Sequence, residues 1–71
     1  MDDKENAKAR IKLVGKLRKE REKARLTQVQ VAKASGVGIN YYAQIERGEV
    51  NFSVEKLLSI MKALKIKSLD I

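Results

Sequence analysis

The chain contains no cysteine, histidine, proline or tryptophan. These absences exclude a disulfide framework, a Cys/His zinc site, a histidine general base and a cysteine nucleophile. The serines therefore lack the partners that would activate them, and lysine-assisted chemistry would need a pocket that so small a core does not provide. We expect no enzymatic activity, no cofactor and no bound metal.

Long apolar runs are also missing. No stretch approaches the 18 residues that a membrane span needs, and no secretory signal precedes the rest of the chain, so we expect a cytoplasmic protein. An alternative is a membrane-surface helix over residues 7–25, which are basic and partly amphipathic, although that stretch has no Trp or Phe. A length of 71 residues indicates one domain, which we place at 7–71 after a disordered leader, 1–6.

What the chain has in excess is positive charge, a net +7. The excess lies mainly in residues 1–25, which hold ten Lys or Arg against five Asp or Glu, whereas residues 26–71 hold six against four. A basic excess favours phosphate backbones, because binding releases condensed counterions. The alternative is that lysine-rich helix faces serve only solubility.

Helical spacing of the apolar residues predicts an all-α fold of four to five helices without strands. The expected helices cover residues 7–24 with Asn6 as N-cap, 28–35, 39–47, a fourth that begins after Ser53, and a short fifth, 69–71, capped by Ser68. On the first helix, Ile11, Val14, Leu17 and Arg21 share one stripe. Gly15 interrupts it, so the regular helix could begin only there.

The segment 27–48 carries the most specific pattern. Thr27 and Gln30 have the spacing of a capping box, and Gly36 and Gly48 are placed to end two short helices. Between these signals lie a small residue for a close helix crossing, an apolar plug in the turn and an apolar face on the second helix: Ala32, Val37, Tyr42 and Ile45. Two helices joined by a tight glycine turn form a helix-turn-helix, which fits the DNA major groove.

At these residues the chain resembles the Cro/repressor (Xre-type) helix-turn-helix family of phages and bacteria, from about Val14 to Ile71. The matching pieces are LRKERE, LTQ, VAKASGV, IERG and LLSIMKAL. The resemblance implies a compact lambda-repressor-like domain in a sequence-specific transcriptional regulator, a repressor or autoregulator, that binds a double-stranded DNA operator. Within the family, NFSVEKLLSIMKALKI is most similar to the controller proteins of restriction–modification systems.

The resemblance also assigns residues to DNA contacts. The positions that face the groove in the family are Ile39, Asn40, Tyr41 and Gln44. An Asn or Gln amide carries a donor and an acceptor together, which matches adenine N6 and N7. The phosphate-contacting candidates are Thr27, Gln28, Lys33, Arg47 and Asn51. The alternatives are ordinary solvated side chains on α-helical surfaces and, for Arg47, a surface ion pair with Glu49.

Other residues are better suited to a structural role than to DNA contacts. In the family, residues that match Arg21 and Glu46 pair across the fold, and we expect the same ion pair here. Three residues depart from the family pattern. Gly38 replaces a capping side chain, Tyr42 replaces an aliphatic core residue and is expected either to keep its hydroxyl at the surface or to shift the helix, and Phe52 replaces a common proline.

We also expect a homodimer, because one recognition helix reads too few base pairs to select a genomic site. The expected interface is the apolar C-terminal part of the chain: Phe52, Met61, Leu64, Ile66, Leu69 and Ile71. The alternative is that these residues close the monomer core. RNA polymerase is a further candidate partner, and the alternative function is a protein-interaction module such as an antitoxin or a polymerase-contacting adaptor.

Overall fold

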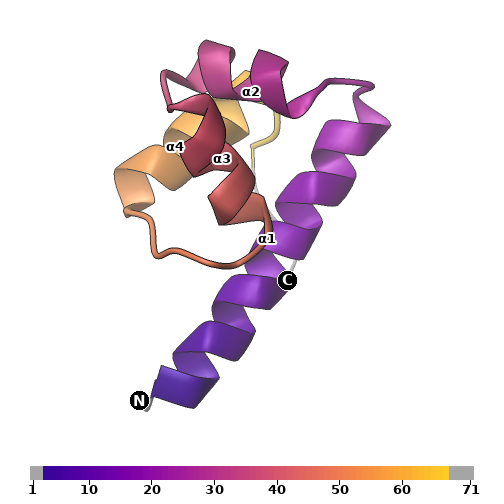
Figure 1. The fold of residues 1–71 in the computed structure, drawn as a ribbon. Helices are drawn as coiled ribbons and strands as arrows, with labels where there is room; N and C mark the ends of the chain where they lie inside the picture. Colours follow the sequence, from indigo (N-terminus) through magenta and orange to yellow (C-terminus); the bar gives the residue numbers. More distant parts are fainter. Residues whose placement is uncertain (1–2, 68–71) are drawn as a thin grey trace.

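The computed structural model describes residues 3–67, with side chains from Ala7 onward, and contains four helices and no strand within that range. The helices are α1 (Asp3–Lys23), α2 (Gln28–Ser35), α3 (Ile39–Glu46) and α4 (Val54–Ala63). α1 runs along one side, and its N-terminal turns project beyond the other helices (Figure 1). The all-α prediction is confirmed, and the expected fifth element, 69–71, lies outside the described residues.

The first helix differs from its expected bounds. α1 begins at Asp3, not after Asn6, and it continues through Gly15 without a break. Part of the expected disordered leader is therefore helical. Good helix formers such as Lys, Arg, Ala and Leu lie on both sides of Gly15, so one internal glycine does not interrupt the helix. No described helix is long and apolar enough to cross a membrane.

The two short helices have local stop signals at both ends. α2 covers the expected residues, and Gly36 follows it with a left-handed φ of 74°. α3 ends at Glu46, one residue before the expected end, and Gly48 has a φ of 73°. Only glycine adopts this conformation without strain, so both glycines end their helices in the expected way. Ser53 caps α4, since its hydroxyl accepts a hydrogen bond from the Lys56 amide.

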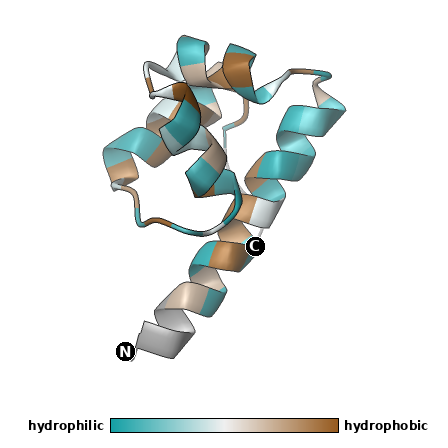
Figure 2. Cartoon of the chain, viewed as in Figure 1, coloured by the Kyte–Doolittle hydropathy of each residue, from teal (hydrophilic) through white to brown (hydrophobic). Residues whose placement is uncertain are grey.

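The core lies where α2, α3 and α4 meet the C-terminal half of α1. Hydrophobic segments of these helices are brown in Figure 2. Its buried residues come from all four helices and two loops: Val14, Leu17, Val31, Ala32, Val37, Tyr42, Ile45, Ile60, Met61 and Leu64. Ile11 was expected on the same stripe, but its side chain is 57% exposed because that part of α1 lies beyond the core. The core thus holds the two short helices against α1 and α4.

Candidate nucleic-acid interface

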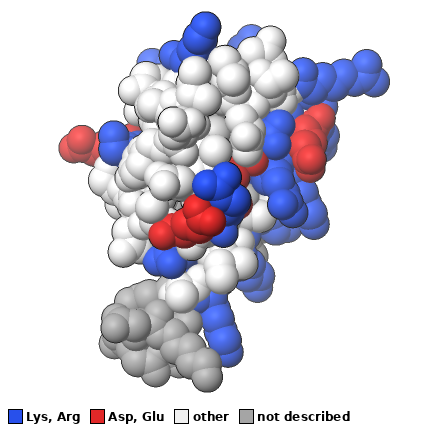
Figure 3. All heavy atoms as spheres, viewed as in Figure 1, with Lys and Arg blue, Asp and Glu red and all other residues white. Residues whose placement is uncertain are grey.

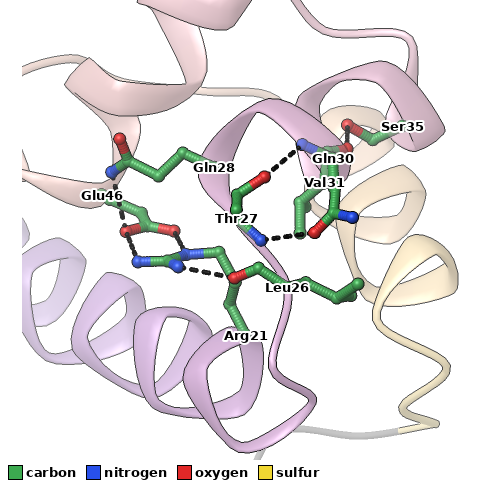
Figure 4. A network of polar contacts seen from close by, with 8 residues as sticks. All are labelled: Arg21, Leu26, Thr27, Gln28, Gln30, Val31, Ser35 and Glu46. Atoms are coloured by element: carbon green, nitrogen blue, oxygen red, sulfur yellow. Dashed lines mark hydrogen bonds and ion pairs between the residues drawn. The ribbon is translucent and has the colours of Figure 1, made fainter.

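Hydrogen bonds define both ends of α2, and those at its C-terminal end lie in the turn to α3. The Thr27 hydroxyl accepts from the Gln30 amide at 3.0 Å, and the Gln30 side chain accepts from the Thr27 amide at 2.8 Å, which completes the capping box (Figure 4). At the other end of α2, the Val37 amide donates to the Ala32 carbonyl at 2.9 Å. Val37 is buried, so the turn is anchored in the core.

The outer face of α3 carries three of the four candidate base readers. Ile39 is 44% exposed, and Asn40 and Gln44 are also exposed. Neither amide makes a hydrogen bond with another described residue. Tyr42 and Ile45 lie on the opposite, buried face. The outer face of α3 therefore offers to solvent an apolar side chain and two amides that are unpaired among the described residues.

Tyr41 is placed differently from the other three. Its ring is half-buried, and its hydroxyl donates a hydrogen bond to the Asn51 carbonyl at 3.0 Å. The ammonium of Lys56 lies 5.5 Å from the centre of the ring, within the range of a cation–π contact. Tyr41 thus connects the start of α3 to the loop before α4.

The candidate phosphate contacts lie on α2 and next to the ends of α2 and α3. Thr27 and Lys33 are exposed, whereas Gln28 donates from its side-chain nitrogen to a Glu46 carboxylate oxygen at 3.1 Å. Arg47 forms a surface ion pair with Glu49 at 3.0 Å, which is the expected alternative to a phosphate contact. Each partner stabilises the other's charge, which raises the pKa of Arg47 and lowers that of Glu49. Such an exposed pair contributes little to stability, and a phosphate can displace it.

Arg21 and Glu46 tie α1 to the end of α3. Arg21 Nε lies 2.7 Å and its Nη2 3.1 Å from the two carboxylate oxygens, and the side chains are only 13% and 2% exposed. Arg21 also donates to the Leu26 carbonyl at 2.8 Å (Figure 4). Burial alone would raise the pKa of Glu46, but the hydrogen bonds it accepts outweigh burial and lower it. One carboxylate thus joins α1, α2 and α3.

Tyr42 is completely buried. The expectation that its hydroxyl stays at the surface is therefore wrong. Its oxygen is the buried side-chain polar atom that lacks a hydrogen-bond partner among the described residues. Burial raises the pKa of Tyr42, and the neighbouring Glu46 carboxylate adds to that rise. The ring is part of the hydrophobic core, and a shift of α3 relative to other family members stays a prediction.

The candidate dimer residues have mixed positions. Met61 and Leu64 are buried in the monomer core, which leaves little of either side chain for a second chain. Ile66 and Phe52 are partly buried against that core, and Phe52 also lines an apolar groove of about 400 Å³ between α1 and the start of α4. Leu69 and Ile71 lie outside the described residues. The interface stays a prediction.

Charge is distributed unevenly over the surface. In the view of Figure 3, uncharged side chains cover most of the face over α2, α3 and α4, while Lys and Arg gather along α1 and at the margins. Asp and Glu also lie on this face, beside some of the Lys and Arg residues (Figure 3). A largely uncharged surface next to basic side chains is compatible with the division between base contacts and phosphate contacts in DNA recognition.

Comparison with known proteins agrees with this geometry. The helix-turn-helix family pattern matches residues 17–71. The chain therefore belongs to the Xre-type helix-turn-helix family, whose members are DNA-binding transcription regulators, and such regulators are typically not enzymes. No curated protein matches the chain.

A solved structure also resembles the chain. It is the restriction–modification controller protein C.AhdI from Aeromonas hydrophila, with 33% sequence identity and a TM-score of 0.78. The match covers 80% of this chain and 86% of that protein. The predicted family and the narrower similarity to controller proteins are both confirmed.

One contact of the interface was not predicted from the sequence. Arg10 lies in the part of α1 that precedes the family match, and it donates hydrogen bonds to the Gly48 carbonyl and the Asn51 side chain. The available signal was spacing, because Arg10 precedes Val14 by four residues and continues the stripe of Val14, Leu17 and Arg21 by one turn.

Proposed function

We propose that the protein is a transcriptional regulator that reads an operator through the major groove with the first turns of α3. The observation that carries the proposal is the pair of exposed amides of Asn40 and Gln44, four residues apart on the outer face of α3 and without hydrogen bonds to other described residues. Residues four apart lie on the same side of a helix, so both amides can reach neighbouring base pairs.

The chemistry of these side chains sets the expected base preference. An amide that donates to adenine N7 and accepts from adenine N6 discriminates against other bases by roughly 1–3 kcal/mol. Ile39, exposed at the start of α3, can pack against a thymine methyl group. We therefore expect A·T base pairs at the positions that Asn40 and Gln44 contact.

Phosphate contacts would come from both sides of α3. The N-terminus of α2 offers unpaired backbone amides and the positive end of its dipole, and Thr27 and Gln28 lie there. Gln28 uses one N–H for Glu46 and keeps the second for a phosphate. Lys33, Arg47 and Asn51 are exposed on the neighbouring surface. These contacts would position the domain without reading sequence.

We further propose that two copies bind as a dimer to an inverted repeat, since one α3 reads only a few base pairs. Half-sites of such a dimer lie one helical turn apart, roughly 34 Å. The name of the similar protein, a restriction–modification controller protein, supports a regulatory role for this chain.

The test is selection from a randomised DNA duplex pool with sequencing of the bound fraction, for the wild type and for Asn40→Ala and Gln44→Ala. Ser59→Ala, an exposed polar residue of α4, is the matched control. The expected result is an inverted repeat with base preferences that relax only at the positions read by the replaced amide. Sequence-blind binding that disappears with salt would refute specific reading and favour the protein-interaction module.

A further inference from the structure

Arg10 makes a two-point contact with the loop between α3 and α4. Its Nε and Nη2 both donate to the Gly48 carbonyl, at 3.2 Å each, and its Nη1 donates to the Asn51 side-chain oxygen. The planar guanidinium thus binds the loop at two residues, Gly48 and Asn51, which are three positions apart. A lysine ammonium in the same position is a single point of charge and cannot reproduce this geometry.

The same stretch of α1 packs closely on the loop. A Cβ atom added at Gly48 would lie 3.0 Å from the Ile11 side chain and 3.9 Å from the Val14 side chain. We call residues 3–16 the α1 extension, because they precede the part of the chain that matches the family. The loop is therefore held by apolar packing as well as by the Arg10 hydrogen bonds.

The contact with Arg10 also fixes the direction of the Asn51 amide. Because its oxygen accepts from Arg10, the side-chain nitrogen is left as the donor, and it makes no hydrogen bond with another described residue. The Asn51 backbone carbonyl in turn accepts from the Tyr41 hydroxyl at the start of α3. Asn51 thus lies between the α1 extension and the helix that carries Asn40 and Gln44.

We propose that Arg10 is a positioning residue for DNA binding: it orients the Asn51 amide toward a phosphate and holds the loop against the first turn of α3. Tyr41 is a second positioning residue: its hydroxyl donates to the Asn51 carbonyl and so holds α3 in place, and it does not contact DNA. The inference rests on the proposed function, since it describes how one part of that interface is held in place. It assigns a role in recognition to the α1 extension, which the family match does not include.

The test compares variants of Arg10 on the operator selected by the wild type. Arg10→Lys keeps the charge and removes the two-point geometry, whereas Arg10→Gln removes both. Lys12→Gln is the matched control, because it removes one charge from an exposed residue of the same extension. Affinities are measured at several salt concentrations, and circular dichroism verifies that each variant is folded.

We expect Arg10→Lys and Arg10→Gln each to weaken binding by at least about tenfold, as for the loss of hydrogen bonds from a charged donor. Lys12→Gln should change affinity by no more than about threefold. Asn51→Ala should weaken binding to a similar extent, and Arg10→Lys should add little to it, because both changes remove the same phosphate contact. The salt dependence of Arg10→Lys should equal that of the wild type.

Three results would overturn the inference. Wild-type affinity in Arg10→Lys, or losses that add in the double variant, would mean that Arg10 does not act through Asn51. A salt slope lowered by about one in Arg10→Gln alone would mean that Arg10 itself contacts a phosphate. If the wild type selects no sequence, the proposed function fails and the inference with it, whereas sequence selection with unaffected Arg10 variants refutes the inference alone.

Discussion

Replacing Glu46 by glutamine removes one negative charge from the point where α1, α2 and α3 meet. The wild-type carboxylate accepts two hydrogen bonds from Arg21 and one from Gln28, at distances between 2.7 and 3.1 Å. Glutamine has the same shape, but its amide nitrogen is a donor and would face the donors of Arg21 or Gln28. The variant therefore leaves the Arg21 guanidinium without its full set of acceptors.

The magnitude follows from burial. Both side chains of the pair are largely covered, at 13% and 2% exposed, so the remaining Arg21 charge cannot recover its interaction with water. Removing one partner of such a pair costs about 3 kcal/mol. For a domain of this size, 1 kcal/mol corresponds to roughly 4–8 °C in melting temperature, so Glu46→Gln should lower Tm by roughly 12–24 °C.

Thermal unfolding followed by circular dichroism measures this effect, at several protein concentrations so that any dimerisation is detected. Glu49→Gln is the control, because it removes a carboxylate from an ion pair that is fully on the surface. We expect that control to change Tm by no more than about 4 °C. Equal, small shifts for the two variants would refute the conclusion that the buried carboxylate holds the helices together.

The dependence of stability on pH tests the role of the Glu46 carboxylate independently. The pKa of Glu46 is lowered in the folded state, so the unfolded chain binds the proton first when pH falls. The stabilisation is therefore complete above the unfolded value of about 4.3 and is lost as pH falls toward the lower folded pKa. The wild type should lose stability in this acidic range more steeply than Glu46→Gln, and parallel curves would contradict the assignment.

Three further substitutions test the packing. Gly15→Ala should increase the free energy of unfolding by about 1 kcal/mol, because a Cβ there would meet no neighbour within 4 Å and alanine favours the helix. Unfolding in urea measures this free energy, and a lower value than in the wild type would refute the open environment of Gly15. Gly48→Ala should cost about 2 kcal/mol, since φ is positive and the new methyl would crowd Ile11; an unchanged urea midpoint would refute this. Tyr42→Phe should be neutral or stabilising by up to about 1 kcal/mol, because it removes a buried hydroxyl that has no hydrogen-bond partner among the described residues; a marked loss of stability in the same assay would show that this hydroxyl donates to Glu46.

Local signals in the sequence predicted the helix-turn-helix well. Thr27, Gln30 and Gly36 act within a few residues of one another, so the bounds of α2 follow from the chain alone. Ser53 has the same local character at the start of α4. The start of α1 was placed four residues late, because Asn6 was interpreted as the N-cap, whereas the helix begins at Asp3 and continues through Asn6.

The sequence could not predict contacts between distant segments. Arg10 looked like one basic residue among many until α1 and the loop after α3 were placed together. For the same reason, the pattern did not distinguish the exposed Ile11 from the buried Val14, or the core positions of Met61 and Leu64 from an interface. Periodicity shows which face of a helix is apolar, but it does not show which neighbour covers that face.

The contact between Arg10 and the loop joins residues that are 38 and 41 positions apart, and it lies outside the core. Partly exposed contacts of this kind open by local fluctuations, at a lower free energy than unfolding of the whole domain. The hydrogen-bonded core that circular dichroism monitors would stay intact during such an opening. On warming, the affinity of the protein for DNA would therefore fall at a temperature where its helical content is still complete.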